Sequence, residues 1–113
     1  MESWDLNAID APAGTRDPVV LHSDPEGRAV LIRIDPGQKL GLHQVKERAW
    51  ICVLEGRIAI DADSGSVEAS PGTLATFAPN EQHAVRSDGG ARILLLLAPW
   101  PGEGHYRGGG QPR

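Results

Sequence analysis

Glycine and proline divide this chain into short apolar runs, and that division is the strongest constraint on its fold. The 14 glycines and nine prolines among 113 residues leave no window with a sustained helical period. Clusters such as Asp35-Pro-Gly37 and Asp88-Gly-Gly90 form turns, and such clusters recur at intervals of about 8–12 residues. This spacing predicts short strands in an all-β sandwich or barrel. The expected strands lie at residues 19–22, 29–34, 50–54, 57–60, 66–69, 74–77, 84–86 and 92–97.

The leucine-rich run at residues 94–97 is the one segment that propensity alone would place in a helix. It lies between the Gly89-Gly90 turn and Pro99, so it has only the length of a strand. We therefore predict a strand here as well.

The length of the chain fits a single domain. We expect residues 18–100 to form the barrel and residues 1–17 to pack on the barrel or on a partner. Residues 101–113 are rich in glycine and proline and contain little that could enter a core, so they predict a flexible C-terminal tail.

Charge and composition exclude several classes of partner. The chain has 11 basic and 15 acidic residues, and it lacks the concentrated basic surface that phosphate binding needs. Its longest apolar stretch, residues 93–100, is far shorter than the roughly 20 residues that cross a bilayer, and no signal-peptide pattern is visible at its start. The single cysteine, Cys52, fits a reducing compartment. We therefore expect a cytoplasmic protein that binds neither nucleic acid nor membrane.

Two segments each combine a glycine with a later histidine. The first runs from Gly37 through His43 to Gly56, and the second runs from Gly72 to His83. In these residues and their spacing the chain resembles the RmlC-like cupin superfamily, as a small single-domain member with degenerate metal-binding motifs. The resemblance implies a double-stranded β-helix, or jelly-roll, barrel of about six to eight strands. In such a barrel the motif histidines converge on one pocket.

The chain departs from the family pattern where the family binds metal. Val45 and Ala49 stand where the first motif has its second histidine and its glutamate. In the second motif Pro79 and Asn80 keep the turn chemistry in a shifted form. The resemblance therefore implies a pocket that has kept one histidine from each motif and lost the other ligands.

A metal site would need a replacement ligand, because transition metals typically take three or more protein ligands. Glu47 or Glu81 could supply an oxygen beside His43 and His83. We interpret Glu47 instead as a solvated loop charge, because its neighbours in sequence are both basic. The cofactor stays unknown, and a divalent transition metal is open but not favoured.

Residues two apart in a strand share a face, so parity and motif register indicate which side chains line the pocket. The histidines suit hydrogen bonding to a ligand or general acid/base catalysis, because the imidazole pKa lies near 6.5. We expect the pocket to bind a small organic ligand, and whether it catalyses a reaction stays open. The alternatives are a metal-dependent enzyme, such as a dioxygenase or a cyclase/isomerase, and a non-catalytic sensor or scaffold. The expected lining is His43, Val45, Ile51, Phe77 and His83, with His43 and His83 as the candidate catalytic residues.

The first-motif strand is apolar on both faces. If its pocket-facing residues alternate from His43, then Trp50, Cys52 and Leu54 face outward, and residues 94–97 show the same two-sided pattern. A strand that is apolar on both faces must be covered on both. The cover could be the N-terminal segment, a second subunit, or both. Small cupins are commonly dimers, so the resemblance implies a homodimer.

Overall fold

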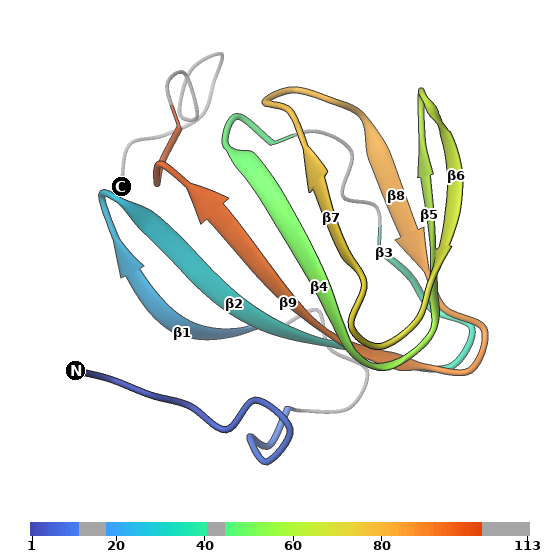
Figure 1. The fold of residues 1–113 in the computed structure, drawn as a ribbon, viewed down its shortest axis with the longest axis horizontal. Coiled ribbons are helices and arrows are strands. Elements are labelled where there is room, and N and C mark those ends of the chain that lie inside the picture. Colours follow the sequence, from blue (N-terminus) through green and yellow to red (C-terminus); the bar gives the residue numbers. More distant parts are fainter. Residues whose placement is uncertain (12–17, 41–44, 103–113) are drawn as a thin grey trace.

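A computed structural model of the chain describes residues 1–11, 18–40 and 45–102 (Figure 1). All regular structure in these residues is β, and no described helix is long and apolar enough to cross a membrane. The described residues form nine strands, one more than expected. The additional strand is the two-residue β3, which is too short to show an alternating pattern. The strands are β1 (Val19–Asp24), β2 (Gly27–Ile34), β3 (Lys39–Leu40), β4 (Arg48–Gly56), β5 (Ile58–Ala62), β6 (Gly65–Ala69), β7 (Leu74–Phe77), β8 (His83–Arg86) and β9 (Ala91–Ala98).

The strands form two antiparallel sheets. One has five strands in the order β1-β2-β9-β4-β7, and the other has four in the order β3-β8-β5-β6. Figure 1 shows the larger sheet curving toward the smaller one. The chain crosses between the sheets several times, so strands adjacent in sequence often lie in different layers. This arrangement confirms the predicted all-β jelly-roll fold.

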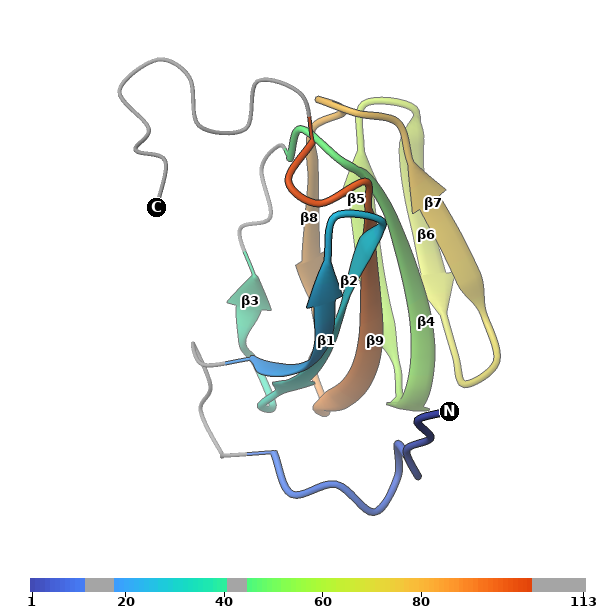
Figure 2. The same ribbon diagram turned by 90° about the vertical axis from the view of Figure 1, so that its left-hand side faces the viewer.

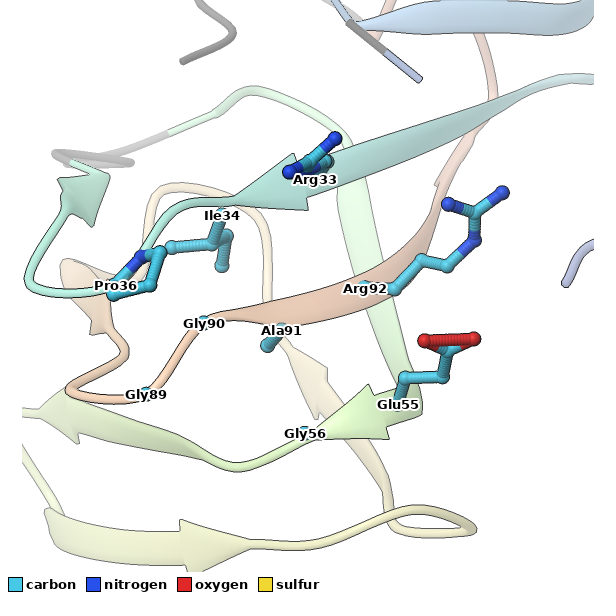
Figure 3. Close-up of a pocket in the computed structure, with 9 residues that line it drawn as sticks. All are labelled: Arg33, Ile34, Pro36, Glu55, Gly56, Gly89, Gly90, Ala91 and Arg92. Atoms are coloured by element: carbon cyan, nitrogen blue, oxygen red, sulfur yellow. The ribbon is translucent and has the colours of Figure 1, made fainter. Parts of the chain in front are cut away.

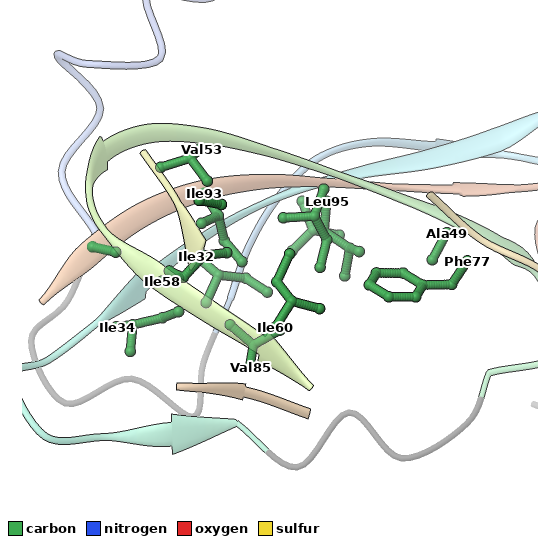
Figure 4. Packing of buried hydrophobic residues seen from close by; sticks show 14 of the residues in the cluster. Ile32, Ile34, Ala49, Val53, Ile58, Ile60, Phe77, Val85, Ile93 and Leu95 are labelled. Atoms are coloured by element: carbon green, nitrogen blue, oxygen red, sulfur yellow. The ribbon is translucent and has the colours of Figure 1, made fainter. Parts of the chain in front are cut away.

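The space between the sheets is filled by aliphatic side chains that alternate along each strand (Figure 4). In β4 the residues Ala49, Ile51 and Val53 are each only 1% exposed, while the residues between them are half-buried. The leucine run of β9 follows the same rule: Ile93 and Leu95 face inward, and Leu96 is 38% exposed. Burial of such side chains contributes roughly 1.5–3 kcal/mol each. Hydrophobic packing between the layers therefore holds the fold together.

The N-terminal segment lies against the outer face of the five-stranded sheet. Arg92 donates to the carbonyl oxygens of Leu6 (2.9 Å) and Ile9, and Arg33 donates to that of Ala11 (3.4 Å). The two arginines are direct partners in the β2–β9 pairing, and Ala11 is buried. Figures 1 and 2 show this segment passing the end of the sheet where β2 ends. The first of the two expected covers, the N-terminal segment, is thus present over part of the face.

Gly56 and Gly90 meet at the end of the barrel where β4 ends and β9 begins. Gly56 ends β4 with a φ of 75°, and a Cβ on it would lie 2.1 Å from the Gly90 carbonyl oxygen. Gly90 has a φ of 92°. The glycine that closes the first motif is therefore required both by the left-handed backbone and by the close approach of a second chain segment.

Candidate functional site

The second motif builds a tight turn in front of β8. The Glu81 N–H donates to the Ala78 carbonyl oxygen at 3.0 Å, with Pro79 and Asn80 between them. Asn80 has a φ of 68°, so proline followed by a left-handed residue gives a type II turn. The Glu81 carboxylate also accepts the Ala78 N–H at 3.0 Å. The structure confirms the prediction that Pro79 and Asn80 preserve the turn of the motif.

This turn sets His83 against Phe77. The two rings are stacked, with centroids 3.9 Å apart and planes inclined by 9°. His83 is 5% exposed and Phe77 is 4% exposed. The Nδ1 atom of His83 lies 3.1 Å from the Glu81 carbonyl oxygen, which can only accept a hydrogen bond. In the neutral ring the proton therefore sits on Nδ1, and Nε2 carries the lone pair.

Two hollows flank the stacked rings. One, of about 340 Å³, is lined by His83 together with Asp61, Ala62, Asp63, Gln82 and Ala84. The other, of about 200 Å³, includes Phe77, Ala62 and Glu81 and lies between the β5–β6 hairpin and β7. Ala62 borders both hollows, and it pairs directly with His83 across β5 and β8. The Phe77–His83 pair thus contributes one ring to each of the two hollows.

The structure brings together only part of the predicted lining. Phe77 and His83 meet, whereas Ile51 lies in the core and borders neither hollow. Val45 is half-buried and packs against the core, and its carbonyl oxygen accepts the Asn80 N–H at 2.7 Å. His43 lies outside the described residues, so its place in the site stays a prediction.

The interpretation of Glu47 as a solvated loop charge is wrong. The Glu47 side chain is fully buried, with 0% exposure, and its Oε2 atom accepts the Gly102 N–H at 2.6 Å. The reason is that the segment after β9 folds back over the start of β4 (Figure 2). A Cβ on Gly102 would lie 2.7 Å from the Lys46 carbonyl oxygen, so the two segments are in close contact. No local pattern reveals a contact across 55 residues.

The segment after β9 is held at a second point by Trp100. Its backbone N–H donates to the Pro25 carbonyl oxygen at 3.2 Å, and the Arg28 guanidinium lies 4.5 Å from its ring centroid. The indole also packs against the hydrophobic core. The expected flexible tail from residue 101 onward is therefore attached to the barrel as far as Gly102. Residues 103–113 lie outside the described part of the chain.

The described residues do not fit a complete metal site. Within residues 1–11, 18–40 and 45–102, no three His, Cys, Asp or Glu side chains are grouped so that they could hold an ion. The two candidate replacement ligands both bind backbone amides: Glu47 accepts from Gly102, and Glu81 accepts from Ala78. The set of His43, His83 and Glu47 or Glu81 depends on a histidine outside the described residues and stays a prediction.

A larger depression lies at the opposite end of the barrel, and the sequence did not indicate it (Figure 3). Its volume is about 530 Å³, and Gly56, Gly89 and Gly90 form much of its wall. Its two arginines, Arg33 and Arg92, hold the N-terminal segment through the bonds described above. We therefore assign this end a structural role and place the candidate site at the Phe77–His83 end.

Solved structures with the same architecture come from several bacteria. A protein from Thermus thermophilus superposes with a TM-score of 0.77 at 21% identity, over 88% of this chain and 98% of that one. An RmlC-like cupin protein from Desulfovibrio desulfuricans gives 0.75 at 23% identity, over 88% and 97% of the two chains. A cupin-superfamily sugar phosphate isomerase from Silicibacter pomeroyi gives 0.58 at 24% identity, over 65% and 50%. At these identities the likeness shows the fold alone.

Comparison with curated proteins gives no match. The family model of the cupin domain, in contrast, matches residues 30–98, which is more than half of the chain and contains both motif segments. This match includes every strand from β4 to β9 and the turn that positions His83. The chain belongs to the cupin family.

Proposed function

We propose that this protein binds a small organic ligand at the Phe77–His83 end of its barrel, without a complete metal site. The observation that carries the proposal is the buried stack of His83 on Phe77 between two hollows. A site of this kind offers an apolar surface for the body of a ligand and one well-oriented polar group, which is how small-molecule sites are commonly built.

The orientation of His83 supports this role. Its Nδ1 atom is held by the Glu81 carbonyl oxygen, and the ring stacks on Phe77, so the imidazole keeps a fixed orientation. A fixed side chain loses little conformational entropy when a ligand binds. The same orientation would also suit a general base, because the neutral tautomer carries its lone pair on Nε2.

A metal-dependent enzyme is the second candidate, and the resemblance of the two motif histidines to family ligands supports it. One structural neighbour is named a sugar phosphate isomerase of the cupin superfamily. Against this candidate stand Val45 and Ala49 at ligand positions, and the backbone N–H groups that donate to one oxygen of Glu47 and one of Glu81. We therefore rank ligand binding first, with a dioxygenase or cyclase/isomerase activity second.

The experiment that tests the proposal is a thermal-shift screen of metabolites, followed by binding and product assays on His83→Gln. If His83 only contacts the ligand, the substitution weakens binding by the worth of a neutral hydrogen bond, about 0.5–1.5 kcal/mol. His22→Gln is the matched control, because His22 is exposed on β1 and lines neither hollow of the site. A product whose formation falls by about 10²–10⁴-fold in His83→Gln, with binding intact, would establish a general base instead.

We also propose that the protein forms a homodimer through the uncovered part of the larger sheet. Leu74, Trp50 and Leu96 lie on the neighbouring strands β7, β4 and β9, and their side chains face away from the core. Leu74 is 59% exposed and Leu96 is 38% exposed, with half-buried Cys52 and Leu94 between them. Contiguous apolar surface of this kind supports burial against a second copy.

A further inference from the structure

The two hollows beside the Phe77–His83 pair share a chemical bias. Every charged side chain among their described lining residues is a carboxylate: Asp61 and Asp63 on the His83 side, and Glu81 on the Phe77 side. The charged groups of the lining therefore act as hydrogen-bond acceptors, and the Gln82 amide adds a neutral donor on the His83 side.

Two of the three hydroxyl side chains that line the second hollow already donate within the protein. The Ser66 hydroxyl donates to Asp61 at 2.7 Å, and the Thr76 hydroxyl donates to the Ala49 carbonyl oxygen at 2.9 Å. The third hydroxyl is that of Ser64, and the rest of the lining, which includes Val67 and Phe77, is mostly apolar. An anionic ligand would therefore meet few groups able to donate to it.

Two arginines and Lys39 lie near the hollows, and none of them reverses the bias, because Lys39, like Arg86, acts on Asp61. Arg86 pairs with Asp61 at 3.3 Å and so offsets the charge of that carboxylate. The pKa of Asp61 lies below its ordinary value, mainly because Ser66 donates to the carboxylate and also because Arg86 lies beside it. Arg48 donates to Thr76 at 3.0 Å, but its neighbour Ala49 points into the core, so Arg48 lies on the outer face of the sheet. Asp63 and Glu81 have no such cationic partner among the described residues.

Resting on the proposed binding function, we propose that this site selects a neutral or positively charged hydrogen-bond donor with a compact apolar body, such as an amine, and disfavours carboxylates and phosphates. The apolar body lies in the hollow between the β5–β6 hairpin and β7, against Phe77. The donor faces Glu81, which lines the same hollow, and Asp63 adds negative charge from the hollow on the His83 side. A volume of about 200 Å³ limits the body to the size of a single small ring.

The test uses three probes that share one ring: cyclohexylamine, cyclohexanol and cyclohexanecarboxylate, at neutral pH. Binding is measured for each on the intact chain through the NMR ring signals of Phe77 and His83. We expect the amine to bind about tenfold or more tightly than the carboxylate, with the alcohol between them, because both carboxylates attract the amine and repel the anion. In the double variant Asp63→Asn, Glu81→Gln this ratio falls to about threefold or less.

Glutamine at position 81 keeps an oxygen that can accept the Ala78 N–H, so the variant removes charge while preserving the turn. Glu68→Gln is the control: it removes the same charge from an exposed residue of β6 that borders neither hollow, and it leaves the ratio unchanged. A carboxylate that binds as tightly as the amine, or a ratio that survives the double variant, overturns the proposed selectivity.

The experiment distinguishes a wrong ligand class from an absent binding site. If the carboxylate binds more tightly than the amine and His83→Gln abolishes that binding, the binding site is retained and the proposed ligand class is rejected. If none of the three probes shifts the Phe77 and His83 signals at millimolar concentration, the binding function itself is rejected, and the selectivity with it.

Discussion

Glu47 and His83 are both buried, and different parts of the chain bury them. His83 follows the Pro79–Asn80 turn and stacks on Phe77, so its surroundings come from its own motif. Glu47 instead accepts a hydrogen bond from Gly102, which lies 55 residues further along the chain. The burial of Glu47 therefore depends on the docking of the segment after β9.

The bond between Glu47 and Gly102 leads to a prediction about stability. Glu47→Ala removes the acceptor from the buried Gly102 N–H, so we expect the free energy of unfolding to fall by about 1–3 kcal/mol. Urea denaturation followed by circular dichroism measures it. Glu68→Ala, at an exposed position of β6, should change stability by less than about 0.5 kcal/mol. Equal effects of the two substitutions would show that the Gly102 contact contributes nothing.

His22 provides a prediction about pH. The His22 Nε2 atom donates a hydrogen bond to Asp24 at 2.7 Å, and this contact is the main cause that raises the pKa of His22 above 6.5. Glu2, at the Nδ1 atom of His22, raises the pKa further. The charged form is favoured in the folded state, so its stabilising effect is present below pH 6.5 and is lost as the pH rises through the folded pKa.

An NMR titration of the His22 ring should give a midpoint above 6.5 that moves down in Asp24→Asn. Glu2→Gln should move the midpoint less, because Glu2 is the smaller cause. A midpoint at 6.5 in the unmodified protein, or one that is insensitive to Asp24→Asn, would contradict this account.

At the level of single strands, the turn residues predicted most of the strand boundaries. The breaks at Asp35-Pro-Gly37 and Asp88-Gly-Gly90 do separate strands, and β9 is a strand because those breaks leave the leucine run too short for a helix. β3 escaped prediction because two residues show no alternation. The order and pairing of the strands in the two sheets could not be derived from periodicity, and the family resemblance implied only the jelly-roll architecture.

Gly56 and Gly37 form a natural pair for testing the role of these turns. Both have positive φ values, of 75° and 79°, but a Cβ on Gly56 would lie 2.1 Å from the Gly90 carbonyl oxygen, whereas Gly37 has open space around it. We expect Gly37→Ala to lower stability by about 1 kcal/mol through backbone strain alone. Gly56→Ala should lower it by about 3 kcal/mol or more, because a steric clash adds to that strain.

Thermal unfolding of the two variants measures the difference. If Gly56→Ala proves no worse than Gly37→Ala, then the close approach of the β4 and β9 ends does not constrain the fold.

At the scale of the whole molecule, the fold could be predicted from the sequence and the site only in part. The alternating pattern predicted that β4 and β9 are apolar on both faces, and the N-terminal segment binds the outer face of the sheet through Arg33 and Arg92. Whether a second copy covers the remaining apolar residues stays a prediction. The hollows beside Phe77 could not be derived, because they depend on how the β5–β6 hairpin lies relative to β7. Sequence patterns fix which face a residue points to, but not the spacing between two edge strands.

The remaining exposed face predicts self-association. Light scattering coupled to size exclusion should give about twice 12.1 kDa at micromolar concentration. Leu74→Glu with Leu96→Glu should convert the protein to a monomer, because both charges would have to be buried at the interface. Val67→Glu is the control, since Val67 is exposed at 54% but lies on the smaller sheet. A monomeric unmodified protein would assign all the cover to the N-terminal segment.

We propose that Phe77 and His83 contact an organic ligand in the pocket, and that the pocket has no complete metal site. Elemental analysis of protein expressed in metal-supplemented medium separates such a site from a metal centre. We expect well under one equivalent of any transition metal per chain, because Val45 and Ala49 cannot act as ligands. A full equivalent that disappears when His43 and His83 are both replaced by glutamine would contradict the claim and place a metal-dependent enzyme first.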